Sequence, residues 1–346
     1  MPSQEQLNDW FYKRKTHKQS LSAALLFPAL ISGNRGALSS AITLVESQVS
    51  EDRKEANKLI KSCSDLNKKA WRIGITGVPG VGKSTFIEAF GKIILEKGLK
   101  LAVLAIDPSS NVSGGSILGD KTRMPWLSQQ DNVFIRPSAT RNNLGGVALN
   151  TREAILLCEA AGFDIIFIET VGVGQSETVV HSMVDFFLLL MLSGAGDELQ
   201  GIKRGIMEMA DLLVITKADG DNLQNAKNAR SQYANALHLF PNKPSTWTSQ
   251  ALISSSVSGA GMPEVWDDIE SFFKKVISNG WLDENRRLQE ITLLKECLSN
   301  LLKQDFFGNN KWKNKFLIAE QKVANGKLSA FIAAEQLFKE YDLRKT

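Results

Sequence analysis

A glycine-rich segment carries the clearest chemistry in the chain. It consists of Gly77, Val78, Pro79, Gly80, Val81, Gly82, Lys83, Ser84 and Thr85. These residues match the phosphate-binding loop pattern GxxxxGK[ST]. Glycines let successive backbone N–H groups turn toward phosphate oxygens, and the positive end of a following helix adds to the attraction. We therefore expect Lys83 to reach the β- and γ-phosphates of a nucleotide and Ser84 to ligate Mg²⁺.

The residues on either side of this segment give the match its weight, because glycine spacing alone is a weak signal. Residues 71–76 form an apolar run typical of a strand, and residues 84–96 have the pattern of a helix. A phosphate-binding loop lies between these two elements in nucleotide-binding proteins. The sequence therefore predicts a nucleoside triphosphate binder.

Three acidic residues fall where strand ends should converge. Asp107 follows a strand predicted over 101–106, Asp120 lies in the loop beyond, and Glu169 ends a strand predicted over 164–169. Mg²⁺ prefers a few oxygen ligands together with phosphate and water. We predict Ser84, Asp107, Asp120 and Glu169 as metal ligands and Lys83, Asp107 and Glu169 as catalytic residues. A merely solvated carboxylate is the alternative at Asp120.

The segment that follows Glu169 is predicted to sense the nucleotide. GTPases place an acidic-x-x-Gly segment at this position, and the N–H group of its glycine, here Gly172, can contact the γ-phosphate. Loss of that contact on hydrolysis should reorganise the neighbouring residues as far as Gln175. Gln175 could orient a water molecule or serve as a structural hydrogen-bonding residue, and we assign it no catalytic role.

A second motif predicts which base the site reads. Thr216, Lys217 and Asp219 end an apolar run at the position of the guanine-reading NKxD element. Asp219 can accept from N1–H and N2–H₂ of guanine, and Lys217 should pack its stem over the base. Thr216 replaces the usual Asn, so we expect the contact to guanine N7 and the brace on the phosphate loop to be lost. GTP remains favoured over ATP. Backbone N–H groups for guanine O6 are expected from Ser255, Ser256 and Val257.

Composition excludes several other classes of protein. The chain has 346 residues, is 43% hydrophobic, and carries 41 basic and 37 acidic residues spread along its length. This balance argues against a dedicated nucleic-acid groove, and we expect no nucleic-acid partner. The few cysteines and histidines lack ligand spacing, so neither disulfides nor zinc are expected. They are Cys63, Cys158, Cys297, His17, His181 and His238.

The chain shows no signal for export or for a membrane. Glu5 and Asp9 interrupt the N-terminus, which fits neither a secretory signal nor an acid-poor transit peptide. The most apolar run, residues 186–192, is far too short to cross a bilayer and fits a buried parallel strand. We expect a cytoplasmic protein without a membrane partner.

Strand and helix patterns alternate from residue 71 to residue 278, which predicts an α/β fold with a doubly wound, mainly parallel sheet of the P-loop NTPase type. Ligand chemistry should cluster at the carboxyl ends of the strands. The predicted strands are Arg72–Thr76, Leu101–Ile106, Asn132–Ile135, Asp164–Glu169, Phe186–Leu192, Leu212–Thr216 and Leu252–Ser254.

Helical segments flank this core on both sides. Residues 1–70 form a predicted N-terminal helical segment, residues 71–278 the nucleotide domain, and residues 279–346 a C-terminal helical arm. The arm has an apolar stripe at helical spacing that must be buried somewhere, and a second copy of the chain is a plausible place. The stripe consists of Leu288, Ile291, Leu294, Leu298 and Leu301. We expect a homodimer formed through this arm.

Several motifs in one order resemble the MeaB/ArgK family, which contains the methylmalonyl-CoA mutase-associated GTPases. They are IDPSS (106–110), GDKTRM (119–124), ETVGVGQSE (169–177) and SGAGDELQGIKRGIMEMAD (193–211). The similarity extends from the N-terminal helical segment to the arm and so covers nearly the whole chain. The departures are Thr216 in the guanine-reading motif and Ser256 where Ala is usual.

The resemblance implies a SIMIBI-class GTPase that acts as a homodimeric chaperone of an adenosylcobalamin-dependent acyl-CoA mutase, gating cofactor loading and protecting or rescuing the mutase. It places phosphate and Mg²⁺ roles on Lys83, Ser84, Asp107, Asp120 and Glu169. It also places a partner-signalling switch on residues 194–203. The residues expected to move are Asp197, Glu198, Gln200 and Lys203, and Lys203 would reach the nucleotide only in the mutase complex.

Other readings stay open at this point. A GTP-dependent metallochaperone of the same lineage would need a Cys/His metal site, and a kinase acting on a transport protein would need an acceptor site. Neither site is visible in the sequence. The client could be methylmalonyl-CoA mutase or a relative such as isobutyryl-CoA mutase. No arginine finger or water-activating glutamine can be assigned, so we expect slow intrinsic turnover that a partner accelerates.

Overall fold

The structure is a computed structural model of the chain, and it describes residues 22–47, 49–106, 123–138, 144–170, 176–194 and 204–342. The chain divides into two compact units, Met1–Arg287 and Leu288–Thr346. The boundary lies inside helix α12 (Trp281–Gly308), and the helices that precede the sheet belong to the first unit. This division differs from the three parts that the sequence suggested, with boundaries at residues 70 and 278.

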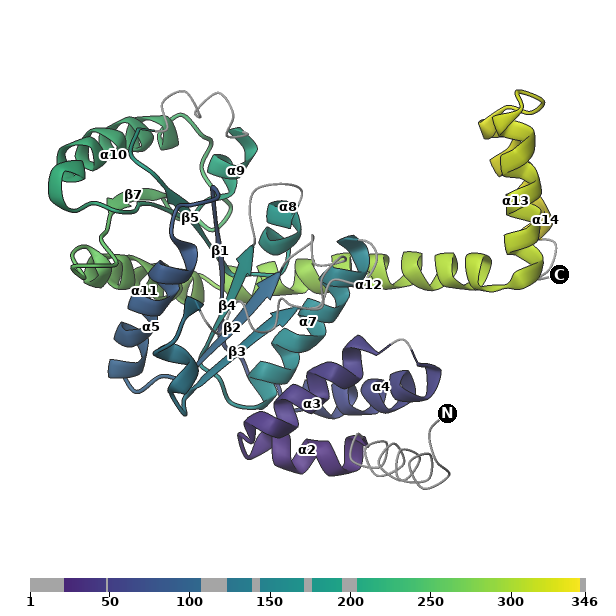
Figure 1. The fold of residues 1–346 in the computed structure, drawn as a ribbon, viewed down its shortest axis with the longest axis horizontal. Helices are drawn as coiled ribbons and strands as arrows, with labels where there is room; N and C mark the ends of the chain where they lie inside the picture. The colour runs from purple at the N-terminus through teal and green to yellow at the C-terminus, as the bar shows by residue number, and fades with distance from the viewer. Residues whose placement is uncertain are drawn as a thin grey trace, which may run out of the picture. The chain divides into compact units, whose positions relative to one another are not determined.

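The first unit contains a sheet of seven strands, all parallel, in the order β3-β2-β4-β1-β5-β6-β7 (Figure 1). The predicted α/β fold is confirmed, and each predicted strand is present with ends that differ by at most a few residues. The strands are β1 (Trp71–Gly77), β2 (Leu101–Ile106), β3 (Val133–Ser138), β4 (Ile165–Thr170), β5 (Phe186–Met191), β6 (Leu212–Ile215) and β7 (Gln250–Ile253).

One face of the sheet is covered by α5 (Lys83–Glu96) and α11 (Met262–Ser278). Alternate strand residues such as Ile73 and Ile75 point to this face, as the period of two in a strand requires. Aromatic rings fill much of the layer, and Trp71 stacks on Phe273 with ring centroids 4.2 Å apart. Burying a side chain of this size contributes about 1.5–3 kcal/mol. The short 3₁₀ helix η2 (Leu127–Gln129) closes the layer beside α5.

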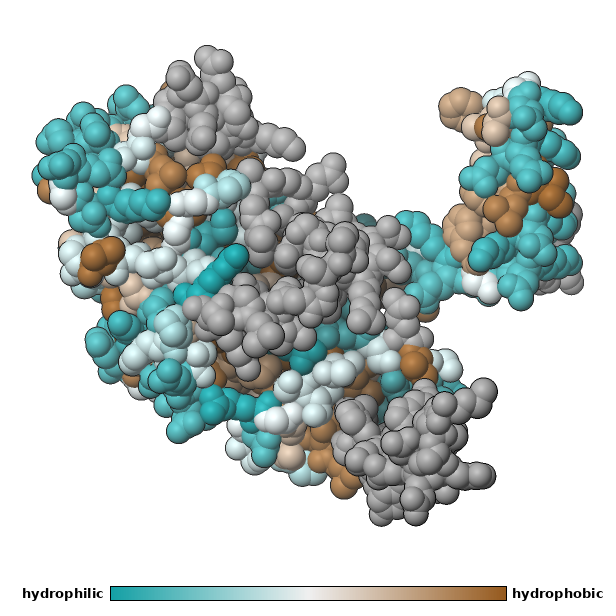
Figure 2. All heavy atoms as spheres, in the orientation of Figure 1, coloured by the Kyte–Doolittle hydropathy of each residue, from teal (hydrophilic) through white to brown (hydrophobic). Residues whose placement is uncertain are grey.

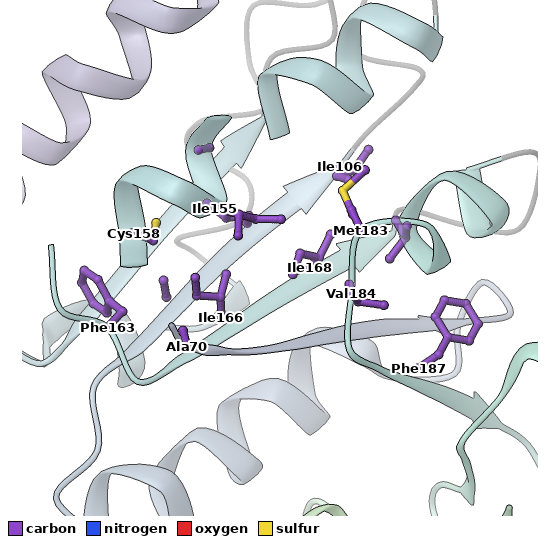
Figure 3. Close-up of a cluster of buried hydrophobic side chains, with 14 of the residues drawn as sticks. Ala70, Ile106, Ile155, Cys158, Phe163, Ile166, Ile168, Met183, Val184 and Phe187 are labelled. Carbon is purple, nitrogen blue, oxygen red and sulfur yellow. The ribbon is translucent and has the colours of Figure 1, made fainter. Parts of the chain in front are cut away.

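The other face is covered by α7 (Leu144–Ala160), α8 (Ser176–His181), α9 (Arg204–Met209) and α10 (Leu223–Leu237). Figure 3 shows how Ile166 and Ile168 of β4 pack here with Ile155 and Cys158 of α7. Another 3₁₀ helix, η3 (Gly220–Asn222), leads directly into α10. Because both faces are covered, the strands read as continuous apolar runs.

Three further helices, α2 (Ala23–Ile31), α3 (Arg35–Glu46) and α4 (Ser50–Ser64), pack on one another and on α7. Ion pairs fix this group to the sheet layer. Arg136, in β3, bonds Glu46 at 2.6 Å, and Arg53 bonds Glu153 of α7 at 2.5 Å. The predicted N-terminal helical segment is therefore a helical layer of the first unit.

The second unit contains the remainder of α12 with α13 (Asn310–Ala324) and α14 (Ala330–Asp342). Its small core is aromatic, since Phe306, Trp312 and Tyr341 contact one another and the Tyr341 hydroxyl donates to Asp305. Apolar side chains remain exposed on this unit (Figure 2). On α12 they include Leu288, Ile291, Leu294, Leu298 and Leu301, the stripe that the sequence singled out.

No helix among the described residues has the length and apolar content that a membrane crossing needs.

Candidate functional site

The glycine-rich loop lies at the carboxyl end of β1 and leads into α5, as the sequence predicts. Its backbone needs glycine at two positions. Gly82 caps α5 with φ +92°, in the left-handed region that side chains disfavour. A Cβ on Gly77 would lie 2.4 Å from the carbonyl oxygen of Leu190 in the neighbouring β5. The loop can therefore keep this shape only with glycine at these two positions.

Lys83 is the first residue of α5 and folds back over the loop. Its ammonium donates to the carbonyl oxygens of Gly77 at 2.9 Å and Val78 at 3.4 Å. Partial burial lowers the pKa of Lys83, the Glu169 carboxylate opposes that shift, and the Arg123 guanidinium adds to it. Within the described part of the chain, the Lys83 ammonium therefore has backbone carbonyls of the loop as its hydrogen-bond partners.

Glu169 lies at the end of β4, between β1 and β2 in the sheet, and is 95% buried. Its carboxylate acts on the Lys83 ammonium, so both groups belong to one site. Beside it, the Thr170 hydroxyl donates to the Thr76 hydroxyl at 2.8 Å, and both residues are fully buried. Sequence reasoning missed this pair, although a threonine ending each of two adjacent strands was a usable signal.

The donor types here are those that a hard cation prefers, because Ser84 follows Lys83 and carries a hydroxyl, and the Glu169 carboxylate acts on the Lys83 ammonium. The described ranges contain no group of three His, Cys, Asp or Glu residues that could hold a metal by itself. The remaining predicted ligand and switch residues lie outside the described part of the chain. These are Asp107, Asp120, Gly172, Gln175, Asp197, Glu198, Gln200 and Lys203.

Thr216 braces the phosphate-binding loop from the end of β6. Its hydroxyl lies 2.8 Å from the carbonyl oxygen of Val81 and 3.3 Å from that of Met191, and the residue is 98% buried. The expectation that replacing Asn with Thr216 leaves the loop unbraced is therefore wrong. A threonine hydroxyl reaches the loop carbonyl because β6 ends close to it, which the sequence could not show.

Lys217 joins the same loop from the next position. Its ammonium donates to the carbonyl oxygen of Gly80 at 2.9 Å, and its stem lies against Gly82. The backbone of Lys217 has φ +57°, an uncommon conformation for a residue with a side chain. The predicted base-reading turn, which contains Thr216, Lys217 and Asp219, is therefore in direct contact with the phosphate-binding loop.

Asp219 is held by Ser255, which follows β7. The Ser255 hydroxyl donates to the Asp219 carboxylate, and the backbone N–H of Ala218 donates to Ser254 at 3.0 Å. Ser255 is fully buried, whereas Val257 is 88% exposed beyond it. The sequence assigned Ser255 and Ser256 only a backbone role, so the side-chain contact of Ser255 to Asp219 was missed. A serine directly after the strand beside the base-reading turn was the available signal.

Comparisons with known proteins place this geometry in a family. The family model "Methylmalonyl Co-A mutase-associated GTPase MeaB" matches residues 38–311. A putative GTPase of Caulobacter vibrioides is 48% identical over 314 residues, covering 91% of this chain and 96% of that protein. The mitochondrial methylmalonic aciduria type A homolog of Mus musculus is 44% identical over 329 residues, covering 92% of this chain and 79% of that protein.

A solved structure shares the fold as well. A crystal structure described as a LAO/AO transport system kinase superposes with a TM-score of 0.73 at 35% identity, covering 94% of this chain and 98% of that one. The match covers nearly the whole chain. The phosphate-binding loop, the buried glutamate and the base-reading turn thus occur on a shared scaffold. The chain belongs to the MeaB family of methylmalonyl Co-A mutase-associated GTPases, and it is itself a GTPase.

Proposed function

We propose that the chain binds GTP across the carboxyl ends of β1, β4, β6 and β7. The single observation that carries this proposal is the pair of lysines on the phosphate-binding loop. Lys83 and Lys217 both donate to loop carbonyls, on either side of the loop. The phosphates of a nucleotide can replace the loop carbonyls as partners of the Lys83 ammonium, and a base can lie along the Lys217 stem.

Guanine selection would rest on Asp219. The Ser255 hydroxyl donates to its carboxylate. A carboxylate has two oxygens that can each accept more than one hydrogen bond, so Asp219 can still accept from a base. Guanine presents two donors on one edge, N1–H and N2–H₂, whereas adenine does not. Thr216 supplies the loop brace but has no amide for guanine N7, so a weaker contact there remains our prediction.

Mg²⁺ would be held by Ser84 and Glu169, together with Asp107 and Asp120 from outside the described residues. When bound, the ion neutralises developing charge on the transferred phosphoryl group. The residues of the chain itself orient the nucleotide: Lys83 pairs with phosphate oxygens, and the loop N–H groups fix the phosphate chain. Because charge compensation and positioning dominate this chemistry, Lys83 is the residue with most effect on turnover.

We further propose that hydrolysis gates the loading and protection of an adenosylcobalamin-dependent acyl-CoA mutase. The family name and the name of the mouse relative support a mutase client. The residues proposed to signal to it are Asp197, Glu198, Gln200 and Lys203. A homodimer through the exposed stripe of α12 would bury Leu294 and Leu298, which are 67% and 56% exposed in the single chain.

The test is GTP hydrolysis by the purified protein with and without the methylmalonyl-CoA mutase of the same organism. ATP is the nucleotide control. The Lys83→Ala variant, purified in the same way, shows how much of the measured hydrolysis comes from a contaminating enzyme. A mutase-dependent rise in rate that is specific for GTP supports the proposal. A GTPase rate that the mutase leaves unchanged over a range of mutase concentrations would refute this client.

A further inference from the structure

The side-chain amide of Asn222 joins two loops that are distant in sequence. Its Nδ2 donates to the carbonyl oxygen of Lys217 at 2.6 Å, and its Oδ1 accepts from the Ser193 hydroxyl at 2.6 Å. A carbonyl oxygen can only accept, so the bond to Lys217 fixes which way the amide points. The Ser193 hydroxyl must then be the donor. Both polar atoms of the Asn222 amide are therefore hydrogen-bonded.

The bond to Lys217 falls where the base-reading turn most needs support. Lys217 has a left-handed backbone at φ +57°, and its ammonium must still reach Gly80 at 2.9 Å. Asn222 ends the 3₁₀ helix η3 and directly precedes α10, so it is a fixed point beside the turn. Holding the Lys217 carbonyl from this point stabilises a conformation that the residue would otherwise leave.

The bond to Ser193 extends the connection to β5. Ser193 lies two residues beyond the end of this strand, and Met191, its last residue, accepts from the backbone N–H of Thr216 at 2.8 Å. The end of β5 therefore contacts the base-reading turn twice, once through Thr216 and once through Asn222. Both routes continue to the phosphate-binding loop, at Val81 and at Gly80.

We infer that Asn222 is a positioning residue for guanine recognition and that it couples the base-reading turn to the chain leaving β5 at Ser193. The inference rests on the proposed base recognition by Lys217 and Asp219. Binding of guanine would hold Lys217 in place and so strengthen the bond from Asn222, which in turn orders Ser193. Removing Ser193 or Asn222 would loosen the same turn through one shared path.

The test measures the affinity of the full chain for Mg-GTP, for inosine triphosphate, which lacks the N2 amino group, and for inorganic tripolyphosphate. The variants are Asn222→Ala, Asn222→Asp, Ser193→Ala and the Ser193→Ala/Asn222→Ala pair. Asn222→Asp keeps the size of the side chain but cannot donate to Lys217. Asn228→Ala is the matched control, because Asn228 lies on α10 with an exposed side-chain bond to Gln224.

Loss of one hydrogen bond that positions the turn is expected to lower the preference for GTP over inosine triphosphate about tenfold in Asn222→Ala and Asn222→Asp. Ser193→Ala should lower it roughly threefold by the same reasoning, and the pair no further than Asn222→Ala alone. Tripolyphosphate affinity should stay within about twofold, since the phosphate contacts remain. Asn228→Ala should match the parent chain.

Three results would overturn the inference. An unchanged preference for GTP in Asn222→Ala removes the positioning role, and equal loss for all three ligands reduces Asn222 to general stability. Effects that add in the double variant remove the shared path. The variant Asp219→Asn distinguishes failure of this inference from failure of the proposed base site. If Asp219→Asn keeps the preference for GTP, the base assignment and this inference both fail. If its preference shifts toward xanthosine triphosphate, the base site stands.

Discussion

Charged side chains at the two ends of the parallel sheet have different kinds of partners. At the amino end, Arg286 of α12 donates twice to Asp185 and once to the carbonyl oxygen of Ala70. Arg72 donates to Glu159 through two nitrogens, at 3.0 and 2.9 Å. All four charged side chains are at least 85% buried. Buried charges persist only when each is paired in this way.

At the carboxyl end, the hydrogen bonds of Lys83 and Lys217 among the described residues go to backbone carbonyls of the phosphate-binding loop. Gly80 and Gly82 of this loop have positive φ angles. Carbonyls are weaker partners for an ammonium than a carboxylate or a phosphate. The amino end is thus built to hold the fold and the carboxyl end to accept a ligand.

The largest loss of stability is expected at Arg286, at the amino end of the sheet. Arg286→Ala removes one partner of a buried ion pair and leaves Asp185 uncompensated, so we expect a loss of about 3–5 kcal/mol in the free energy of unfolding. Urea denaturation of the full chain measures this loss. The neighbouring Arg287→Ala is the control. Arg287 is exposed, where it pairs with Glu284 and donates to the carbonyl oxygen of Asp283 at 3.4 Å, and its loss should cost less than about 0.5 kcal/mol. Similar losses in the two variants would contradict the comparison.

Lys83→Ala should show the opposite pattern. We expect GTP hydrolysis to fall about 10²–10³-fold, because one preorganised charge at the phosphates is lost. The free energy of unfolding should stay the same or rise, since partial burial of the Lys83 ammonium disfavours its charged form. Steady-state phosphate release and urea denaturation report the two effects. A large loss of stability with normal turnover per folded molecule would reverse the assigned roles of the two ends.

Asp268, on α11, is a buried carboxylate that does not follow the paired arrangement of the amino end. Burial, with repulsion from Asp211, raises the pKa of Asp268 to about 7, and its Oδ2 is buried without a hydrogen-bond partner. In the unfolded chain, Asp268 has a pKa near 3.8. Asp268 therefore lowers the free energy of unfolding progressively as pH rises from about 4 to about 7. Asp268→Asn should therefore stabilise the protein by roughly 2 kcal/mol at pH 8 and very little at pH 4.

Urea denaturation of the parent chain and Asp268→Asn at several pH values tests this sign. The difference between the two proteins should grow with pH and level off above the folded pKa. A difference that is the same at pH 4 and pH 8 would show that Asp268 does not titrate in this range.

The smallest expected effect separates the brace from the ligand contacts. Thr216→Val removes the hydroxyl that bonds the Val81 carbonyl oxygen while keeping the shape of the side chain. We expect a loss of about 1 kcal/mol in stability and about fivefold weaker GTP binding, because the loop is less well held. Thr216→Ser keeps the hydroxyl and should behave nearly as the parent chain in calorimetric titration with Mg-GTP. Equal losses in both variants would place the effect in packing rather than in the brace.

The features that could be predicted from the sequence are those whose signals are local. Apolar runs such as 186–192 identified the strands, since a strand buried on both faces has no polar residues to alternate. The spacing of the loop through Lys83 identified phosphate binding, because backbone geometry demands glycine at fixed positions. The base-reading role of Asp219 rests on its motif and stays a prediction. None of these inferences needed knowledge of which strands are neighbours.

Contacts between segments that are distant in sequence could not be predicted and depend on the complete fold. Thr216 and Val81 are 135 residues apart, and Arg286 and Asp185 are 101 apart, yet each pair is in hydrogen-bond contact. The sheet order brings them together, and that order is set by the packing of whole elements rather than by any local pattern. The change from Asn to Thr216 thus reads as a loss in the sequence, whereas in the fold the hydroxyl still reaches the loop because β6 ends beside it.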